Sequence, residues 1–192
     1  DDEICPINTD AGVISEDGCI RETSLESMSK LSPVFRENGS VTAATSSPLT
    51  DGAVCMIVCS SEFAEINGLE PLARIVSSAV TGCPPEIMGI GPIKSTEIAL
   101  NRSGWTIDDV DVFEINEAFS SQSLAVINDL SIDYQKVNLD GGAISIGHPL
   151  GASGARIVGK AASILRRTGS NKALATMCIG GGMGISITLE SI

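Results

Sequence analysis

The chain has 192 residues, 43% of them hydrophobic and 19% charged, which is typical of a globular protein with a sizeable core. Its formal net charge of −12 argues against nucleic acid or an anionic membrane surface as a general partner. No apolar run reaches about 18 residues, so the sequence predicts no transmembrane helix. From the acidic start, Asp1-Asp2-Glu3, we expect no basic signal or transit peptide at this end.

Cysteine and histidine usage argues against a metal site. The chain holds one histidine, and no two of its six cysteines form a C-x-x-C pair, which is a poor basis for binding zinc. Without a secretory context, we expect all six thiols to be reduced in an intracellular compartment. Cys55 and Cys59 lie in an apolar run, so we expect them to be buried small hydrophobes.

Residues 1–40 lack a sustained hydrophobic period and contain turn signals such as Asp17-Gly18. One short helix is expected at 24–31, where Thr23 and Glu26 resemble a capping box. The composition shifts near Ser40. We therefore expect residues 1–40 to be an excursion from a neighbouring domain and residues 41–192 to form a core domain.

From Ser40 onwards the apolar pattern is regular. Apolar runs predict strands at 54–59, 72–80, 110–115, 173–179 and 185–190. Helical segments are expected at 61–67, 93–103, 117–130 and 153–168, with glycines just beyond three of their ends at Gly68, Gly104 and Gly169. This alternation predicts an α/β layered fold with a largely parallel sheet, closed by a terminal antiparallel hairpin.

The loop from Asp140 to Arg156 surrounds His148, the only histidine, with glycines and with Pro149. Glycine lets the backbone approach a ligand closely, and Pro149 pushes His148 away from helical backbone angles. Histidine frequencies alone favour an ordinary surface or core residue beside a glycine-rich connection. The surroundings of His148 in the predicted sheet favour a functional role instead.

Three reactive or polar side chains are predicted to converge on one rim of the sheet. Asn116 follows the strand at 110–115, and Cys178 lies at the carboxyl end of the strand at 173–179. The helix after His148 runs back antiparallel to the strands, so its amino end faces the same edge. Open α/β sheets place their ligands at this edge.

Each member also has an ordinary explanation. Asn116 could cap the following helix, Cys178 could be a buried thiol, and residues 180–184 could form a simple hairpin turn. Taken together, a histidine, a cysteine and an asparagine beside free backbone N–H groups suit carbanion or thioester chemistry. The segment Gly151-Ala152-Ser153-Gly154 does not match a nucleophile elbow, so a serine hydrolase finds no support.

Several motifs resemble those of the thiolase family. Asn116-Glu117-Ala118-Phe119, Gly147-His148-Pro149 and Cys178-Ile179-Gly180-Gly181-Gly182 are similar to its NEAF, GHP and CxGGG signatures. Residues 41–53 resemble its coenzyme A loop, 88–92 its MGIGP segment, and DDEICPI at the start the middle of its loop domain. Related condensing ketosynthases carry no cysteine at the place of Cys178. The resemblance implies a thiolase-like fold: the C-terminal core half at 41–192, and the remainder of a loop domain at 1–40.

The resemblance also implies catalytic roles. His148 would activate a nucleophilic cysteine and, with a water held by Asn116, would form one oxyanion site. Cys178 would move the proton at the α-carbon, and the backbone N–H of Gly180 would help form a second oxyanion site. Backbone donors near Cys178 lead us to expect it to be the most readily alkylated thiol.

Substrate contacts are implied in the same way. Coenzyme A thioesters would be the substrates, with no separate cofactor and no metal. The residues implied to contact the pantetheine or, nearer the nucleotide, the rest of coenzyme A are Ser47, Met88, Phe119, Ala43 and Ser27. Ala44-Thr45 stands where the family usually has Gly-Asn, which leaves the acyl chain length open.

The acylated cysteine of thiolases lies in an N-terminal half, and no cysteine of this chain sits in that motif. The resemblance therefore implies an acyltransferase that catalyses reversible Claisen condensation or thiolytic cleavage of 3-ketoacyl-CoA, here as the half without the nucleophile. The partners expected are an N-terminal thiolase half and, when complete, a homodimer or tetramer in the cytoplasm, or in mitochondria or peroxisomes if eukaryotic. The alternative is a non-catalytic acyl-CoA or lipid-binding module.

Overall fold

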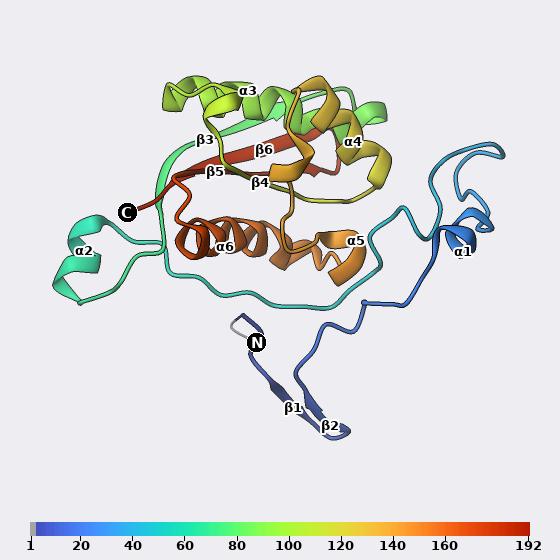
Figure 1. Cartoon of the computed structure of the whole chain (residues 1–192), viewed down its shortest axis with the longest axis horizontal. Coiled ribbons are helices and arrows are strands. Elements are labelled where there is room, and N and C mark those ends of the chain that lie inside the picture. Colours follow the sequence, from blue (N-terminus) through green and yellow to red (C-terminus); the bar gives the residue numbers. More distant parts are fainter. Residues whose placement is uncertain (1–2) are drawn as a thin grey trace.

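A mixed four-stranded sheet forms the centre of the molecule, with helices on both of its faces (Figure 1). The computed structural model describes residues 3–192; Asp1 and Asp2 of the acidic start lie outside them. The strands are β3 (Arg74–Gly82), β4 (Val112–Ile115), β5 (Lys172–Ile179) and β6 (Met183–Glu190), in the order β3-β6-β5-β4. The α/β layered fold that the sequence predicts is confirmed.

The sheet contains both parallel and antiparallel strand pairs. Strands β4 and β5 are parallel, and β6 is antiparallel to both of its neighbours, β5 and β3. Strands β3, β4 and β5 therefore share one direction, as expected, but only β4 and β5 form a parallel pair. The terminal hairpin does not add to an edge of the sheet, because β6 lies between β3 and β5.

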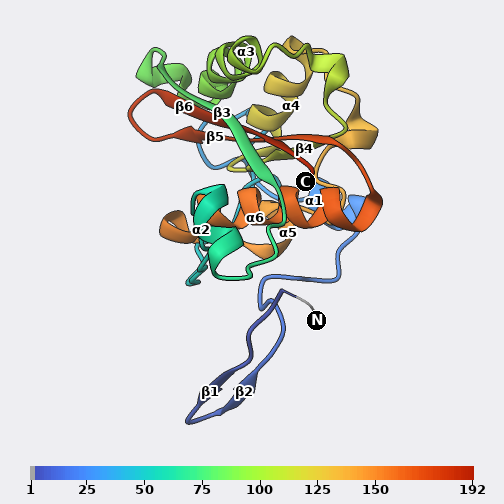
Figure 2. The same ribbon diagram turned by 90° about the vertical axis from the view of Figure 1, so that its left-hand side faces the viewer.

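The two helical layers bury different faces of the sheet. Helices α3 (Gly91–Ser103) and α4 (Ser120–Asp129) cover one face, and α6 (Leu150–Thr168) covers the other (Figures 1 and 2). Neighbouring residues of β4 contact opposite layers. Val112 packs in the cluster with Ile157 and Leu165 of α6, whereas Phe113 packs with Leu100 of α3 and Ile127 of α4. This is the alternation expected of a strand that is buried on both faces.

Hydroxyl groups form much of the contact between α3 and the sheet. Ser186 Oγ of β6 lies 2.7 Å from Ser95 Oγ, 3.0 Å from Thr96 Oγ1 and 2.8 Å from Thr176 Oγ1. Further along the same contact, Ser103 Oγ lies 2.7 Å from Thr188 Oγ1. These small side chains are buried or half-buried and satisfy one another, which avoids the cost of burying unpaired polar groups.

The glycines predicted correctly where the helices end, but two of the predicted helix starts are wrong by three residues. Gly104 and Gly169, both with φ of +70°, end α3 and α6, and Gly68 lies just beyond α2 (Ser61–Ile66). Helix α6 begins at Leu150 rather than at 153, and α4 begins at Ser120 rather than at 117. Residues 117–119 are not helical, and the backbone here bonds to an earlier segment instead: Ser47 N donates to Ala118 O, and Ser120 N donates to Thr45 O.

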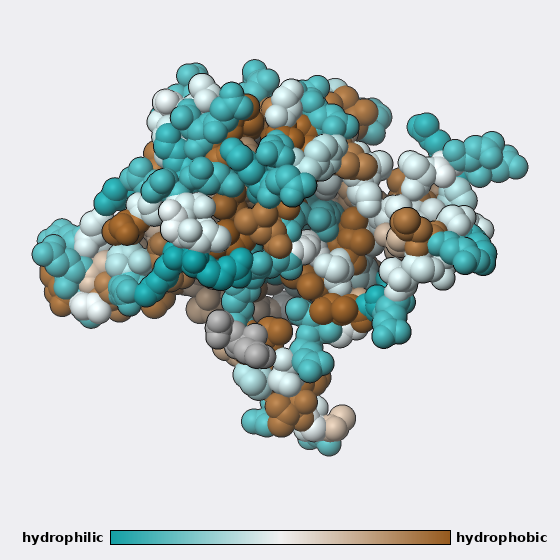
Figure 3. All heavy atoms as spheres, in the orientation of Figure 1, coloured by the Kyte–Doolittle hydropathy of each residue, from teal (hydrophilic) through white to brown (hydrophobic). Residues whose placement is uncertain are grey.

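The remaining elements are short. They are β1 (Ile7–Thr9), β2 (Gly12–Ile14), α1 (Leu25–Ser29), α5 (Ala143–Ile146) and the 3-10 turns η1 (Pro85–Ile90), η2 (Ile107–Asp109) and η3 (Tyr134–Lys136). The β1–β2 hairpin projects from the body (Figures 1 and 2), and Figure 3 shows hydrophobic atoms on it. The expected capping box is wrong: Ser24 caps α1 by accepting from Ser27 N, 3.1 Å away.

The strand predicted at 54–59 is absent. These residues form an irregular segment that runs along α6 (Figure 1), and every one of them is exposed. A strand needs a neighbouring strand edge, and this segment lies across a helix instead. Cys55 and Cys59 are consequently exposed, so the expectation that they are buried is wrong. Among the described residues, no helix is both long enough and apolar enough to span a membrane.

Candidate active site

The expected rim of the sheet brings Asn116 and His148 together. Asn116 follows β4 directly and is 1% exposed, with its N–H donating to Thr176 O of the adjacent parallel strand. Helix α6 starts at the same edge, and His148 lies two residues before it. Asn116 Nδ2 lies 3.3 Å from His148 Nε2. Two distant parts of the sequence are thus in hydrogen-bond contact.

The hydrogen bonds of His148 define which nitrogen carries its proton. Its Nδ1 lies 2.6 Å from Ser153 Oγ, and Ser153 Oγ donates to Pro149 O at 3.0 Å. Because the serine hydroxyl has one proton and uses it on Pro149, Nδ1 must be the donor to Ser153. The lone pair of Nε2 then faces Asn116 Nδ2, which donates to it. Nε2 is therefore the basic nitrogen of the site.

The imidazole is held neutral. Burial is the main cause that lowers the pKa of His148 below its usual value, and the positive charge of Arg156 lowers it further. A neutral imidazole at neutral pH can accept a proton, as a general base must. The backbone fixes its position as well, since His148 N donates to Thr50 Oγ1 at 3.1 Å.

Asn116 keeps one hydrogen-bonding group available. Its Oδ1 is buried and has no partner among the described residues, whereas its Nδ2 contacts His148. A buried acceptor without a donor is costly, so this oxygen suits a hydroxyl, an amide or a water that enters the site. Asn116 does not act as a helix cap here, because α4 begins only at Ser120.

The glycine-rich loop is positioned by residues that the sequence did not single out. Asn138 Oδ1 accepts from Ile115 N at 2.8 Å, and Asn138 Nδ2 donates to Ile115 O at 2.9 Å. The same Nδ2 also donates to Glu117 Oε1. Glu117 Oε2 accepts from Ile144 N at 3.1 Å. A side chain at Gly142 would collide with the Glu117 carboxylate. Glu117 could have been noticed beside Asn116, but nothing in the sequence marks Asn138.

Cys178 lies on the same edge but is less closely joined to the pair. It is the penultimate residue of β5 and is 7% exposed. Among residues 3–192, no hydrogen bond connects it to His148 or Asn116. Burial is the main cause that raises the pKa of its thiol, which opposes thiolate formation. The expectation that Cys178 is the most readily alkylated thiol is therefore reversed, since Cys5, Cys55 and Cys59 are exposed.

The remaining expected residues lie in several separate segments of the chain. Gly180 lies in the turn between β5 and β6, where Gly181 and Gly182 both have φ of +91°. Ser47 is fixed through its N and its Oγ to Ala118 O. Phe119 packs edge-on against Phe35, with ring centroids 6.1 Å apart. Met88 lies in η1, Ala43 in the segment before Ser47, and Ser27 in the exposed helix α1.

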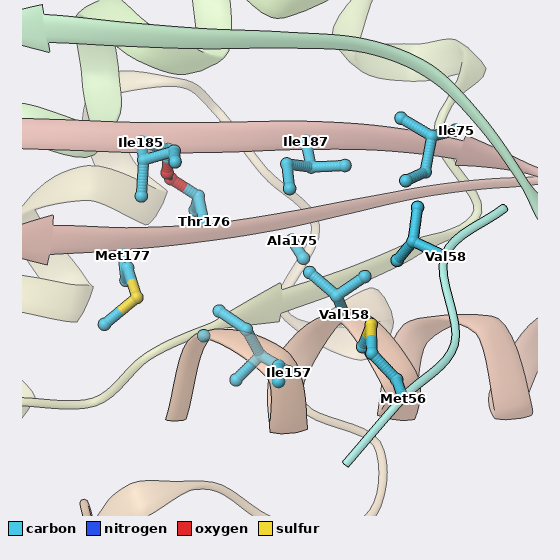
Figure 4. Close-up of a pocket in the computed structure, with 12 residues that line it drawn as sticks. Met56, Val58, Ile75, Ile157, Val158, Ala175, Thr176, Met177, Ile185 and Ile187 are labelled. Atoms are coloured by element: carbon cyan, nitrogen blue, oxygen red, sulfur yellow. The ribbon is translucent and has the colours of Figure 1, made fainter. Parts of the chain in front are cut away.

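An apolar groove of about 290 Å³ lies between α6, the sheet and the segment after residue 53 (Figure 4). Figure 4 shows Met56 and Val58 reaching the groove from that segment, opposite Ile185 and Ile187 of β6. Val158 of α6 forms another part of the wall. An apolar recess of this kind is typical of a surface that another polypeptide or an apolar ligand covers.

Known proteins are similar to this chain in sequence and in structure. The family described as "Thiolase, C-terminal domain" matches residues 69–191, and "Thiolase, N-terminal domain" matches residues 1–62. An acetyl-CoA acetyltransferase of Chromobacterium violaceum is 47% identical over 88% of this chain and 43% of its own length. A 3-ketoacyl-CoA thiolase of Marinobacter nauticus is 50% identical over 99% of this chain and 51% of its own length.

Solved structures agree. Human mitochondrial 3-ketoacyl-CoA thiolase in complex with CoA superimposes with a TM-score of 0.91 at 42% identity, over 97% of this chain and 48% of that one. The acetyl-CoA acetyltransferase of Bacillus anthracis gives a TM-score of 0.93 at 40% identity, over 97% of this chain and 48% of that one. The chain thus spans about half the length of these relatives. Because the thiolase C-terminal domain alone accounts for more than half of its residues, the chain belongs to the thiolase family.

Proposed function

We propose that this chain provides the acid–base half of an acyltransferase that condenses or cleaves 3-ketoacyl-CoA thioesters. The observation that supports this most directly is the orientation of His148. Ser153 holds Nδ1 protonated, so the lone pair of Nε2 points to the rim, and the lowered pKa keeps that nitrogen unprotonated and able to accept a proton. The relatives' names provide the substrate class, namely acetyl-CoA and 3-ketoacyl-CoA.

In the cleavage direction, His148 Nε2 takes the proton of a nucleophilic thiol, and the thiolate attacks the 3-keto carbonyl. The carbon–carbon bond breaks, and the leaving carbanion takes a proton from the Cys178 thiol, which becomes a thiolate. The raised pKa of Cys178 suits this role, because a thiol that stays protonated at rest is a ready acid. The backbone N–H of Gly180, and Asn116 with His148, would stabilise the oxyanions. Coenzyme A then resolves the acyl-enzyme: its thiol gives its proton to the Cys178 thiolate, its sulfur takes the acyl group, and the released cysteine thiolate recovers its proton from His148. In the condensation direction each step runs in reverse.

The nucleophilic cysteine is proposed to come from an N-terminal thiolase half, with residues 1–40 belonging to the loop domain and 41–192 to the C-terminal core. The apolar groove supports such a partner, because it offers a surface for packing. Coenzyme A would contact Ser47, Met88, Phe119, Ala43 and Ser27. We place the assembled enzyme, a homodimer or tetramer, in the cytoplasm, or in mitochondria or peroxisomes in a eukaryote.

Reconstitution tests the proposal. The 192-residue chain is co-expressed with the N-terminal half of the Marinobacter nauticus thiolase, and acetoacetyl-CoA cleavage by coenzyme A is followed by absorbance. We expect turnover from the pair and none from the chain alone, because covalent catalysis needs the missing thiolate. His148→Ala should lower kcat by about 10²–10⁴-fold, whereas Cys5→Ser, at an exposed position, is the control. Coenzyme A binding without turnover in any reconstituted pair would favour the non-catalytic module instead.

A further inference from the structure

A second polar pair lies behind the rim, between β4 and α6. Glu114 is two residues before Asn116 and shares its side of β4 with Val112, which faces α6. The side chain is 1% exposed, and its Oε1 has no hydrogen-bond partner among the described residues. A buried carboxyl group in this state is costly unless a donor reaches it.

Arg156 is the matching group on α6. It follows Ser153, the partner of His148, by less than one helical turn. Its Nε and Nη1 atoms are buried and likewise have no partner among the described residues. After burial, its charge is the largest influence on the pKa of Glu114, so the two groups lie within electrostatic range of each other. No direct hydrogen bond joins them in residues 3–192, and one bridging water could satisfy both.

The other charged groups around this pair already have partners. Lys160 bonds Glu3 at 2.7 Å and Asp140 at 3.1 Å, and Asp140 also bonds Arg167 at 2.7 Å. Glu117 accepts from Asn138 and from the backbone of Ile144. Of these charged groups, Glu114 and Arg156 are therefore the two that keep atoms without a partner among the described residues.

We propose that Glu114 and Arg156 form a water-bridged buried pair that fixes the start of α6 on β4 and so holds His148 beside Asn116. They are positioning residues, since neither contacts the reacting atoms. Glu114 belongs to the strand that ends at Asn116, and Arg156 to the helix whose first turn carries Ser153. A bridge between them therefore restrains both partners of the 3.3 Å contact between Asn116 and His148. The importance of this restraint for catalysis rests on the proposed role of His148 as a base. The experiments that test the restraint do not measure activity and are independent of that role.

The single histidine makes the test clean, because ¹⁵N-histidine labelling of this chain reports His148 alone. Arg156→Met removes a positive charge that lowers the pKa of His148, so an NMR titration should show that pKa rising in this variant. It should also shift the ¹⁵N signals away from the single Nδ1–H tautomer. Arg156→Lys keeps the charge but loses the planar guanidinium, so it should leave the pKa low while still disturbing the tautomer signals.

Coupling between the two residues is measured by a double-mutant cycle on thermal unfolding. Glu114→Leu and Arg156→Met each leave one buried polar group without its partner, whereas the double variant removes both. The loss of Tm in the double variant should be clearly smaller than the sum of the single losses. If Glu114→Leu does not fold, Glu114→Met, which is also apolar and closer to the length of the glutamate, replaces it in the cycle. Arg166→Met, an exposed cation of the same helix, is the control.

Additive losses of Tm would overturn the pairing, and ¹⁵N tautomer signals of His148 that are unchanged in folded Arg156→Met would overturn the positioning role. These outcomes are independent of the reconstitution experiment. An inactive complex with an intact cycle would count against the proposed function only.

Discussion

Glu114 is buried and His148 is half-buried, and the burial of each side chain favours its uncharged form. It lowers the pKa of His148 and raises that of Glu114 to about 8, against the opposing charges of Arg156 and Lys160. For His148 the effect serves the site, because it keeps Nε2 available as a base. For Glu114 it means that the folded chain retains a proton that the unfolded chain releases.

This difference predicts a pH dependence of stability. Between pH 4.5 and about 8, the unfolded state loses the Glu114 proton and the folded state keeps it, so the free energy of unfolding falls as pH rises. Glu114→Gln should therefore gain stability relative to the wild type as pH rises through this window. His148 acts in the opposite sense: below pH 6.5 the unfolded state takes up a proton that the folded state resists, so its contribution falls as pH falls.

Urea unfolding followed by circular dichroism, from about pH 5 to pH 8.5, checks this expectation. Glu97→Gln, at an exposed position of α3, is the control and should run parallel to the wild type. A Glu114→Gln curve that also runs parallel to the wild type would show that Glu114 does not titrate as its burial implies.

At the scale of elements, the glycine loop before α6 is fixed by contact as well as by backbone angle. Gly147 has φ of +98°, and a Cβ there would collide with the side chain of Thr50. Thr50 Oγ1 in turn accepts from His148 N and donates to Pro48 O. The loop therefore carries His148 into the site only while residue 147 has no side chain.

Gly147→Ala should destabilise the chain by about 1–3 kcal/mol and displace His148. Gly169→Ala is the matched control, because Gly169 also has positive φ, but no atom lies within 4 Å of its Cβ position. The control should lose some stability and keep the ¹⁵N signals of His148 unchanged. Equal losses in both variants, with His148 undisturbed, would mean that the Thr50 contact is unimportant.

Local signals predicted most of the elements, while long-range contacts decided the rest. The glycines after α3 and α6 and the apolar runs of β3, β4, β5 and β6 were sufficient to place these elements. The insertion of β6 between β5 and β3 depends on pairing across the chain, which no local pattern shows. Residues 54–59 have the composition of a buried strand, but the segment lies against α6 without a strand partner.

The candidate site likewise contains residues that local sequence signals predict and residues that only long-range contacts reveal. Asn116, His148 and Cys178 could be placed on one rim from strand order alone. Ser153, Thr50 and Asn138 could not, because their roles depend on side-chain contacts between distant segments or within a helix turn. Glu114 lies in an apolar strand, where its unpaired oxygen becomes visible only once α6 covers it.

At the scale of the whole molecule, the groove between α6 and the sheet leaves apolar surface open. Met56, Val58 and Ile75 form one part of its wall, and all three are exposed. The chain matches about half the length of its relatives, so a partner of similar size could cover this face. Until it is covered, the surface favours association between copies.

We expect the purified chain to self-associate at micromolar concentration, and Val58→Asp to shift it towards the monomer by placing a charge in the groove. Val34→Asp is the control, since Val34 is 63% exposed and Val58 67%, but only Val58 lines the groove. Analytical ultracentrifugation measures the distribution of species. A wild-type chain that stays monomeric, or equal effects of both substitutions, would contradict the role of the groove.

The hydroxyl contact of α3 has a consequence for temperature. Ser95, Thr96 and Ser186 hold α3 to the sheet through hydrogen bonds, whereas Ile157, Ile164 and Leu165 hold α6 through apolar contacts. Apolar burial carries a large heat-capacity change and weakens on cooling, while buried hydroxyls contribute with the opposite sign. On cooling, the contact of α6, with His148 at its start, should therefore weaken more than the contact of α3, which depends partly on hydroxyl hydrogen bonds and partly on apolar residues such as Leu100.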